Sequence, residues 1–186
     1  MKVTIFNGSP LTSGNTSALS SILMAKLAGR GAEVEEIMLF QKNVLGCNHC
    51  DRCRADDLPL RCSIPDDMIR LYDKFLDSDL LIFASPIYMW NLTPCTLAFI
   101  TRLHCLCRSP DGHNLMKGIN LALALTMGDE ADVARHAVDS MSEFCEYFLI
   151  NFKGDMAVPF ADKDEILSGK HDEDADAFLD EILPQS

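Results

Sequence analysis

Short apolar runs alternate along this chain with longer segments of helical periodicity, and this alternation constrains the fold more than any other feature. Strands that alternate with helices form a parallel sheet covered on both faces, so the pattern predicts an α/β fold. We expect strands over residues 2–6, 34–39, 80–84, 120–127 and 152–158. We expect helices over 15–31, 63–76, 94–107 and 133–148, with a last one in the acidic stretch 161–186.

Chain length and charge narrow the class of protein. With 186 residues, the sequence predicts one domain that covers 1–186. Lys and Arg number 16 against 28 Asp and Glu, a net charge of −12, which argues against binding to nucleic acids or to anionic membranes. The N-terminus carries no signal-peptide core, and no apolar run reaches about 18 residues. We therefore expect a cytoplasmic protein with neither a membrane partner nor a nucleic-acid partner.

The loop expected after the first strand, residues 8–17, is rich in glycine, serine and threonine. Small residues let the backbone turn tightly, and the start of the next helix adds N–H groups and positive dipole potential, a combination that binds phosphate. The loop contains no Lys or Arg, and it matches neither the P-loop nor the dinucleotide-binding glycine pattern. An ordinary capped helix start is the alternative interpretation. The candidate phosphate-site residues are Ser9, Pro10, Ser13, Asn15, Thr16 and Ser17.

Four short motifs give the sequence a resemblance to the flavodoxin-like NAD(P)H-dependent FMN oxidoreductases. They are Gly8-Ser9-Pro10 with Gly14-Asn15-Thr16, Cys62 with Asp66-Asp67-Met68, Asp79 with residues 82–88, and Thr126-Met127-Gly128, in this order over residues 1–130. The resemblance implies a flavodoxin-like three-layer sandwich, with a five-stranded parallel sheet in the order 2-1-3-4-5 and helices on both faces. It also implies FMN as cofactor, NAD(P)H as electron donor, and a homodimer, with a tetramer left open.

The loops after the third and fourth strands complete the predicted cofactor site, since ligands of such sheets bind at the carboxyl ends of strands. Tyr88 and Trp90 offer flat apolar surfaces suited to a flavin ring, although packing in a loop core or a subunit interface is an alternative. Because the flavin itself carries the hydride chemistry, no catalytic acid or base is assigned. The candidate residues are Pro86, Ile87, Tyr88, Met89, Trp90 and Asn91, together with Thr126, Gly128 and Asp129.

The chain departs from the pattern of the resembled family in two places. Leu11 stands where the family commonly has an Arg in the phosphate loop. On the helix after the ring loop, Leu97 and Thr101 replace a Lys and an Asp, while Arg102 is retained. The losses of Arg and Lys remove positive charge near the expected cofactor, which weakens the argument for efficient NADPH use more than the argument for FMN.

Cys47, Cys50, Cys53 and Cys62 have the most distinctive spacing in the chain, C-x2-C-x2-C-x8-C. Two-residue gaps let thiolates converge on one cluster, as in ferredoxin-type runs. Iron–sulfur flavoproteins, one branch of the resembled family, add a cysteine cluster in this region, so these four residues are candidate ligands of a [4Fe–4S] cluster. Free redox-active thiols, zinc and a disulfide remain alternatives. The other cysteines, Cys95, Cys105, Cys107 and Cys145, are expected to pack as small apolar residues.

Three functions compete at this stage. The leading one is an FMN-dependent oxidoreductase that passes electrons from reduced nicotinamide to a quinone, a nitro compound or another acceptor, including a protein. The second is an iron–sulfur flavoprotein electron carrier with a [4Fe–4S] cluster. The third is a non-catalytic FMN-binding redox sensor whose cysteine loop, residues 46–62, reports thiol state.

Overall fold

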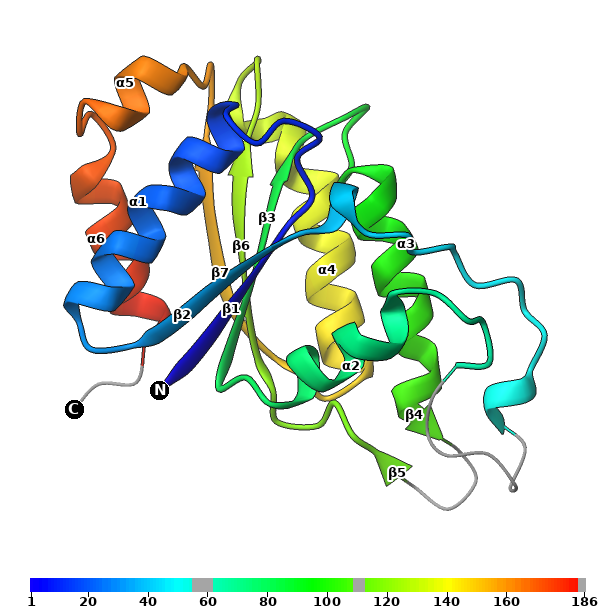
Figure 1. Cartoon of the computed structure of the whole chain (residues 1–186). Coiled ribbons are helices and arrows are strands. Elements are labelled where there is room, and N and C mark those ends of the chain that lie inside the picture. The colour runs from blue at the N-terminus through cyan, green and yellow to red at the C-terminus, as the bar shows by residue number, and fades with distance from the viewer. Residues whose placement is uncertain (55–61, 109–112, 184–186) are drawn as a thin grey trace.

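The computed structural model describes residues 1–54, 62–108 and 113–183. Its centre is a five-stranded parallel sheet with the strand order β2-β1-β3-β6-β7 (Figure 1). Because β4 (Cys107–Arg108) and β5 (His113–Asn114) pair only with each other, β6 and β7 are the fourth and fifth strands of the sheet. The predicted order 2-1-3-4-5 is therefore confirmed. The five strands are β1 (Lys2–Asn7), β2 (Glu33–Met38), β3 (Leu80–Pro86), β6 (Asn120–Thr126) and β7 (Asn151–Val158).

Helices cover both faces of the sheet, as the alternating pattern predicts (Figure 1). One face holds α1 (Asn15–Gly29), α5 (Lys163–Leu167) and α6 (Asp172–Ile182), and the other holds α2 (Met68–Leu76), α3 (Pro94–Arg102) and α4 (Arg135–Tyr147). The central strands β1, β3 and β6 are buried on both faces, which explains their continuous apolar runs. No helix in the described parts of the chain is long and apolar enough to cross a membrane.

An aromatic cluster fixes α3 against the sheet. The ring centroid of Phe99 on α3 lies 4.6 Å from that of Phe6 and 5.7 Å from that of Phe83, and all three side chains are fully buried. Each such pair contributes about 1 kcal/mol beyond the area it buries. Gly8, just after β1, lets α3 come this close, since a Cβ there would lie 2.0 Å from the Thr96 hydroxyl oxygen. The start of α3 is thereby held beside the loop that follows β1.

The acidic last helix packs its apolar residues into the core and pairs part of its charge with α1. Phe178 and Leu179 are buried, as the helical spacing in this stretch predicts. On the outer face, Asp176 accepts hydrogen bonds from Lys26 Nζ at 2.8 Å and from Arg30 at 3.1 Å. The acidic stretch, expected to form one helix, forms two helices of the sandwich, α5 and α6.

Two predicted helices differ from the observed ones at their ends. The helix expected from Ser63 begins at Met68, because the Asp66 carboxylate binds an arginine and the backbone instead of serving a capping box. The helix expected over 94–107 ends at Arg102 and continues as a 3-10 turn over Leu103–Leu106. Cys107 then enters the small β4–β5 hairpin.

Candidate functional site

The loops that follow β1, β3 and β6 meet at the carboxyl edge of the sheet, and we call residues 8–17, 85–91 and 126–129 the strand-end site. A cavity of about 220 Å³ lies among them. It brings together residues from all three predicted segments, the first and last of which are more than a hundred positions apart in the sequence. Its walls are Ser9, Leu11, Gly14, Asn15, Thr16, Pro86, Ile87, Tyr88, Thr126, Met127 and Gly128.

The N-terminus of α1 opens into this cavity without a side-chain cap. Gly14 occupies the N-cap position, and no side chain in the described part of the chain accepts a hydrogen bond from the first turn. An uncapped first turn presents several N–H donors and the positive end of the helix dipole, which together favour an anion. The serine, threonine and asparagine side chains of the loop therefore do not cap α1 as the alternative interpretation expected.

Three hydroxyls of the loop form hydrogen bonds within the protein. Thr16 Oγ1 lies 2.7 Å from Thr126 Oγ1, which ties the loop to the end of β6. Ser17 Oγ donates to the Leu11 carbonyl at 2.7 Å, and Ser9 Oγ contacts the backbone of the same residue at 3.2 Å. These hydroxyls shape the loop, so its backbone N–H groups are left as the main donors to a ligand.

Asn15 reaches a segment that sequence reasoning missed. Its Nδ2 donates to the Ala161 carbonyl at 2.6 Å, in the loop after β7. In the same loop, the N–H of Ala161 donates to the Met127 carbonyl at 2.9 Å, and Phe160 N–H donates to Asp129 at 3.3 Å. Phe160 has a φ of 44° and is exposed. The signal was available, since Pro159-Phe160-Ala161 follows the fifth strand as the other site loops follow theirs.

The predicted ring loop is a tight two-residue turn. Tyr88 and Asn91 exchange both backbone hydrogen bonds, at 2.9 and 3.0 Å. Between them, Met89 and Trp90 have φ angles of 50° and 61°, in the left-handed region where glycine or asparagine is usual. Each residue held there costs about 1 kcal/mol or more, and such strain concentrates at functional sites.

The turn presents its apolar side chains to solvent and to a second cavity. Met89 is 85% exposed and Trp90 is 57% exposed. The cavity has a volume of about 170 Å³ and adjoins the loop after β6. The Asp129 carboxylate accepts a hydrogen bond from the N–H of its neighbour Glu130 at 2.8 Å. The lining residues are Ile87, Met89, Trp90, Met127, Gly128, Asp129 and Val133.

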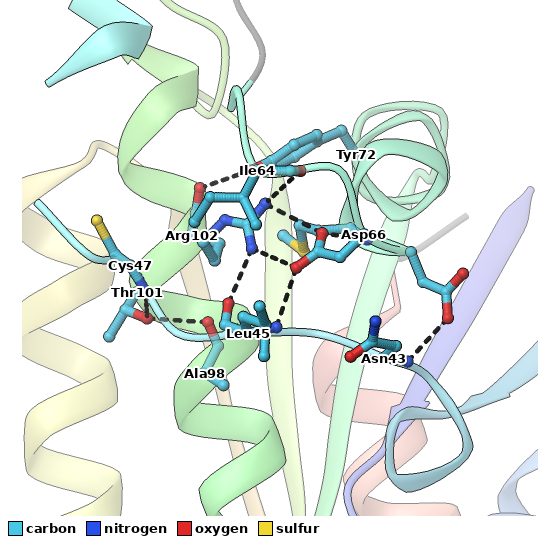
Figure 2. Close-up of polar contacts among 11 residues, drawn as sticks. Asn43, Leu45, Cys47, Ile64, Asp66, Tyr72, Ala98, Thr101 and Arg102 are labelled. Carbon is cyan, nitrogen blue, oxygen red and sulfur yellow. Dashed lines mark hydrogen bonds and ion pairs between the residues drawn. The ribbon is translucent and has the colours of Figure 1, made fainter. Parts of the chain in front are cut away.

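A buried ion pair holds both ends of the cysteine segment, residues 46–62, and we call Arg102 and Asp66 the clamp (Figure 2). Arg102 is 1% exposed, and its two terminal nitrogens lie 2.6 and 3.1 Å from the Asp66 carboxylate oxygens. Arg102 also donates to the carbonyls of Leu45 at 2.8 Å and Ile64 at 3.5 Å, which flank the segment. The arginine therefore joins the chain before the first cysteine to the chain after the last one.

The electrostatics of the clamp favour its charged form. Burial alone would raise the pKa of the Asp66 carboxyl, but hydrogen bonds from Arg102 and from the Leu45 N–H hold it below its usual value. Arg102 Nε has no partner in the described part of the chain. Sequence reasoning noted Arg102 without its partner, although a lone arginine on an apolar helix and an Asp-Asp pair were both visible.

Two further contacts fix the flanks of the cysteine segment. The N–H of Asn43 donates to the Asp67 carboxylate at 2.8 Å. The N–H of Cys47 donates to Thr101 Oγ1 at 3.3 Å (Figure 2). Thr101, which departs from the family pattern, thus holds the first cysteine of the segment.

The four candidate cluster ligands occupy unequal environments. Cys47 and Cys50 are exposed, whereas Cys53 and Cys62 are half-buried against the core. Burial and the nearby thiolates, Cys62 first, raise the pKa of Cys53. Hydrogen bonds from the Arg52 backbone and from Ser63 lower the pKa of Cys50. Within the described residues, no three His, Cys, Asp or Glu side chains lie close enough together to hold a metal ion.

The remaining cysteines lie in or against the core. Cys145 is fully buried, and burial raises its pKa to about 12. Cys105 is also buried, with its pKa raised to about 11 chiefly by burial. Both therefore stay as neutral thiols at pH 7 and pack as small apolar residues. Cys95 and Cys107 are half-buried against the same cluster.

Solved structures with this fold include an NAD(P)H:quinone oxidoreductase from Methanothermobacter marburgensis. It is 12% identical in sequence and superposes with a TM-score of 0.76. The match covers 100% of this chain and 98% of that protein. At this identity the likeness concerns the fold, and it agrees with the sheet order described above.

Two curated relatives match about half of the chain. An iron-sulfur flavoprotein of Methanosarcina thermophila is 33% identical over 91 residues, which cover 49% of this chain and 46% of that protein. An iron-sulfur flavoprotein of Archaeoglobus fulgidus is 34% identical over 103 residues, 55% of this chain and 46% of that protein. The matched stretches thus span about half the length of these relatives.

The family comparison covers nearly the whole chain. The model of the NADPH-dependent FMN reductases matches residues 1–179, from β1 into α6. The match therefore includes every loop of the strand-end site as well as the cysteine segment. By its sequence and its fold, the chain belongs to the NADPH-dependent FMN reductase family.

Proposed function

We propose that the chain is an FMN-dependent oxidoreductase that takes electrons from NADH or NADPH and passes them to a small acceptor such as a quinone or a nitro compound. The observation that carries the proposal is the uncapped N-terminus of α1 at the cavity of the strand-end site. A ligand with one phosphate and one flat ring suits this cavity, because the helix start favours an anion and the ring loop offers apolar walls.

The residues present fit such a ligand. The loop 8–17 would hold the phosphate through backbone N–H groups, with Ser9, Pro10, Ser13, Asn15, Thr16 and Ser17 forming the cradle. Pro86, Ile87, Tyr88, Met89, Trp90 and Asn91 would place the ring, together with Thr126, Gly128 and Asp129. When bound, FMN supplies the ring that accepts and returns electrons. The protein's part is to bind and orient the ring.

The chain contributes no basic side chain to the loop 8–17, and Leu11 there is 62% exposed. A phosphate would therefore be neutralised by the helix dipole and by N–H groups alone. We also propose one domain over 1–186 that works in the cytoplasm as a homodimer, supported by the exposed apolar turn at Met89 and Trp90.

A second candidate is an iron–sulfur flavoprotein electron carrier. Its support is the similarity to two iron-sulfur flavoproteins and the clamp that joins the two flanks of the cysteine segment. As placed in the described residues, the thiols of Cys47, Cys50, Cys53 and Cys62 do not converge on one point. They do not fit a cluster in this arrangement, so we derive no electron path through one.

One experiment tests both candidates. The protein is purified without oxygen, its visible spectrum is recorded, and iron and acid-labile sulfide are measured. We expect a flavin spectrum that NADH or NADPH bleaches rapidly. Absence of flavin even after addition of FMN would contradict the main proposal, and flavin without iron would remove the second candidate. Flavin that neither nicotinamide reduces would favour a redox sensor.

A further inference from the structure

A separate apolar pocket lies beside the strand-end site. It has a volume of about 320 Å³, and its walls come from four parts of the chain. The start of α3 and the 3-10 turn over Leu39–Gln41 pack against each other here. Tyr88 lines both this pocket and the cavity at the phosphate loop, so we call it the Tyr88 pocket. Its main lining residues are Pro10, Phe40, Val44, Tyr88, Cys95 and Ala98.

The walls of the Tyr88 pocket are apolar and aromatic. Phe40 is 60% exposed and Tyr88 is 47% exposed, so two rings stand at one hollow without being covered by the described residues. The volume falls at the small end of the range for small-molecule sites. An occupant of matching size and flat shape would bury both ring surfaces, at roughly 25 cal/mol per Å² of apolar area.

The threonine and cysteine side chains in the wall already have partners within the protein. Thr93 Oγ1 lies 2.9 Å from Thr96 Oγ1 and 3.3 Å from Cys95 Sγ. The Cys95 thiol donates to the Gly8 carbonyl at 3.4 Å. No Asp, Glu, Lys, Arg or His is among the lining residues described. A charged occupant would lose its hydration without gaining a partner.

The pocket also has a fixed wall towards the strand-end site. The backbone of Tyr88 is held by its two hydrogen bonds to Asn91. Another wall residue, Val44, lies three positions before Cys47, whose N–H donates to Thr101 Oγ1 of α3 at 3.3 Å. The pocket is thus built between two anchored segments.

We propose that the Tyr88 pocket binds a planar, uncharged aromatic molecule at a site separate from the FMN phosphate and from the charged nicotinamide. That this molecule is an electron acceptor rests on the proposed function, whereas its binding does not. Because the occupant would contact Tyr88, it would lie next to the predicted ring loop without entering the cavity there.

Equilibrium dialysis with 2-naphthol tests the pocket, with the anion 2-naphthoate as the charged counterpart of the same ring system. The protein as purified should bind 2-naphthol saturably and 2-naphthoate about tenfold more weakly or worse. Quinones are unsuitable as probes, since they react with the free thiols of the chain.

Two variants and one control locate the binding. Ala98→Leu fills the pocket from a helix surface and should weaken 2-naphthol binding about fivefold or more. Val44→Asp, which adds a charge to the wall, should weaken it about tenfold or more. Tyr147→Ala removes an exposed aromatic ring from α4, away from both sites, and should change nothing. Unchanged circular dichroism confirms that each variant is folded.

The outcomes separate this proposal from the main one. Displacement of 2-naphthol by FMN, or equal binding to wild type and both pocket variants, would overturn the Tyr88 pocket. So would binding that emerges only on dilution to a monomer, because a second copy of the chain would then fill the hollow. Binding of 2-naphthol by a protein that takes no FMN would support the pocket and contradict the proposed function.

Discussion

At the strand-end site, backbone hydrogen bonds between neighbouring strands continue into the loops that follow them. In the cysteine segment, by contrast, the described contacts anchor the residues at its two flanks. The N–H of Ile87 donates to Thr126 at 2.9 Å, and that of Met127 donates to Val158 at 3.1 Å. The cysteine segment depends on the clamp of Arg102 and Asp66, helped by Thr101 and Asp67. The strand-end site is shaped by many small contacts, whereas the flanks of the cysteine segment depend chiefly on one buried ion pair.

This difference predicts how each region responds to change. Single substitutions at the strand-end site should alter binding while the fold persists, because neighbouring backbone bonds remain. A substitution in the clamp should lower the stability of the whole domain, because it leaves a charge buried without a partner. The predictions below test this contrast.

The largest expected effect is that of Arg102→Ala. It leaves the Asp66 carboxylate, whose side chain is 1% exposed, without its charged partner. Breaking a buried pair by removing one member costs about 3–5 kcal/mol. Urea unfolding followed by circular dichroism measures the loss. The matched control is Lys74→Ala, which removes an exposed ion pair with Glu35 and should cost about 1 kcal/mol or less. Equal losses in the two variants would contradict the clamp.

The pH dependence of the clamp follows from the lowered pKa of Asp66. A carboxyl with a lower pKa in the folded than in the unfolded protein adds stability above its unfolded pKa, near 4, and loses it as the pH falls through its folded pKa. The free energy of unfolding of the wild type should therefore fall on acidification. This fall should be part of the loss that Arg102→Ala causes, since both remove the ion pair with Asp66. Asp66→Asn, which lacks the ionisable group, should lack this component of the pH dependence. Parallel pH profiles for wild type and Asp66→Asn would refute the assignment.

At the strand-end site, Thr16→Ala should weaken FMN binding about tenfold. It removes the 2.7 Å hydrogen bond to Thr126 that ties the phosphate loop to β6, worth about 1–1.5 kcal/mol. Titration of flavin fluorescence gives the dissociation constant. Ser21→Ala on the same helix, whose hydroxyl contacts only Ser17 O among the described residues, is the control and should bind FMN normally. An unchanged constant for Thr16→Ala would remove Thr16 from the site.

The fold was predictable because its signals are local and repeated. Continuous apolar runs at β3 and β6 indicated strands buried on both faces. The parallel topology then predicted that the loops after the strands would meet at one edge of the sheet. The helix ends were less predictable. Ser63 has a sound capping pattern, but Asp66 is used by an arginine 36 positions away, and local propensity carries no sign of that contact.

The same division holds within the candidate site. Small residues in 8–17 and the aromatics of the ring loop could be found from residue type alone. The uses of Thr16 and Asn15 could not, since both bind segments more than a hundred residues distant. The strain at Met89 and Trp90 was equally hidden, because a sequence that avoids glycine gives no hint of positive φ angles.

That strain yields the smallest predicted effect and the sharpest contrast with the clamp. Trp90→Gly should raise the free energy of unfolding by about 1 kcal/mol, because glycine adopts the φ of 61° without the cost borne by other residues. Trp90→Ala keeps that cost and should give no such gain. Both variants should bind FMN more weakly, since each loses the exposed ring. Urea unfolding without added FMN, followed by circular dichroism because the one tryptophan is gone, gives the stability. If Trp90→Gly were no more stable than Trp90→Ala, the φ of 61° would carry no conformational cost, and the turn would not be strained.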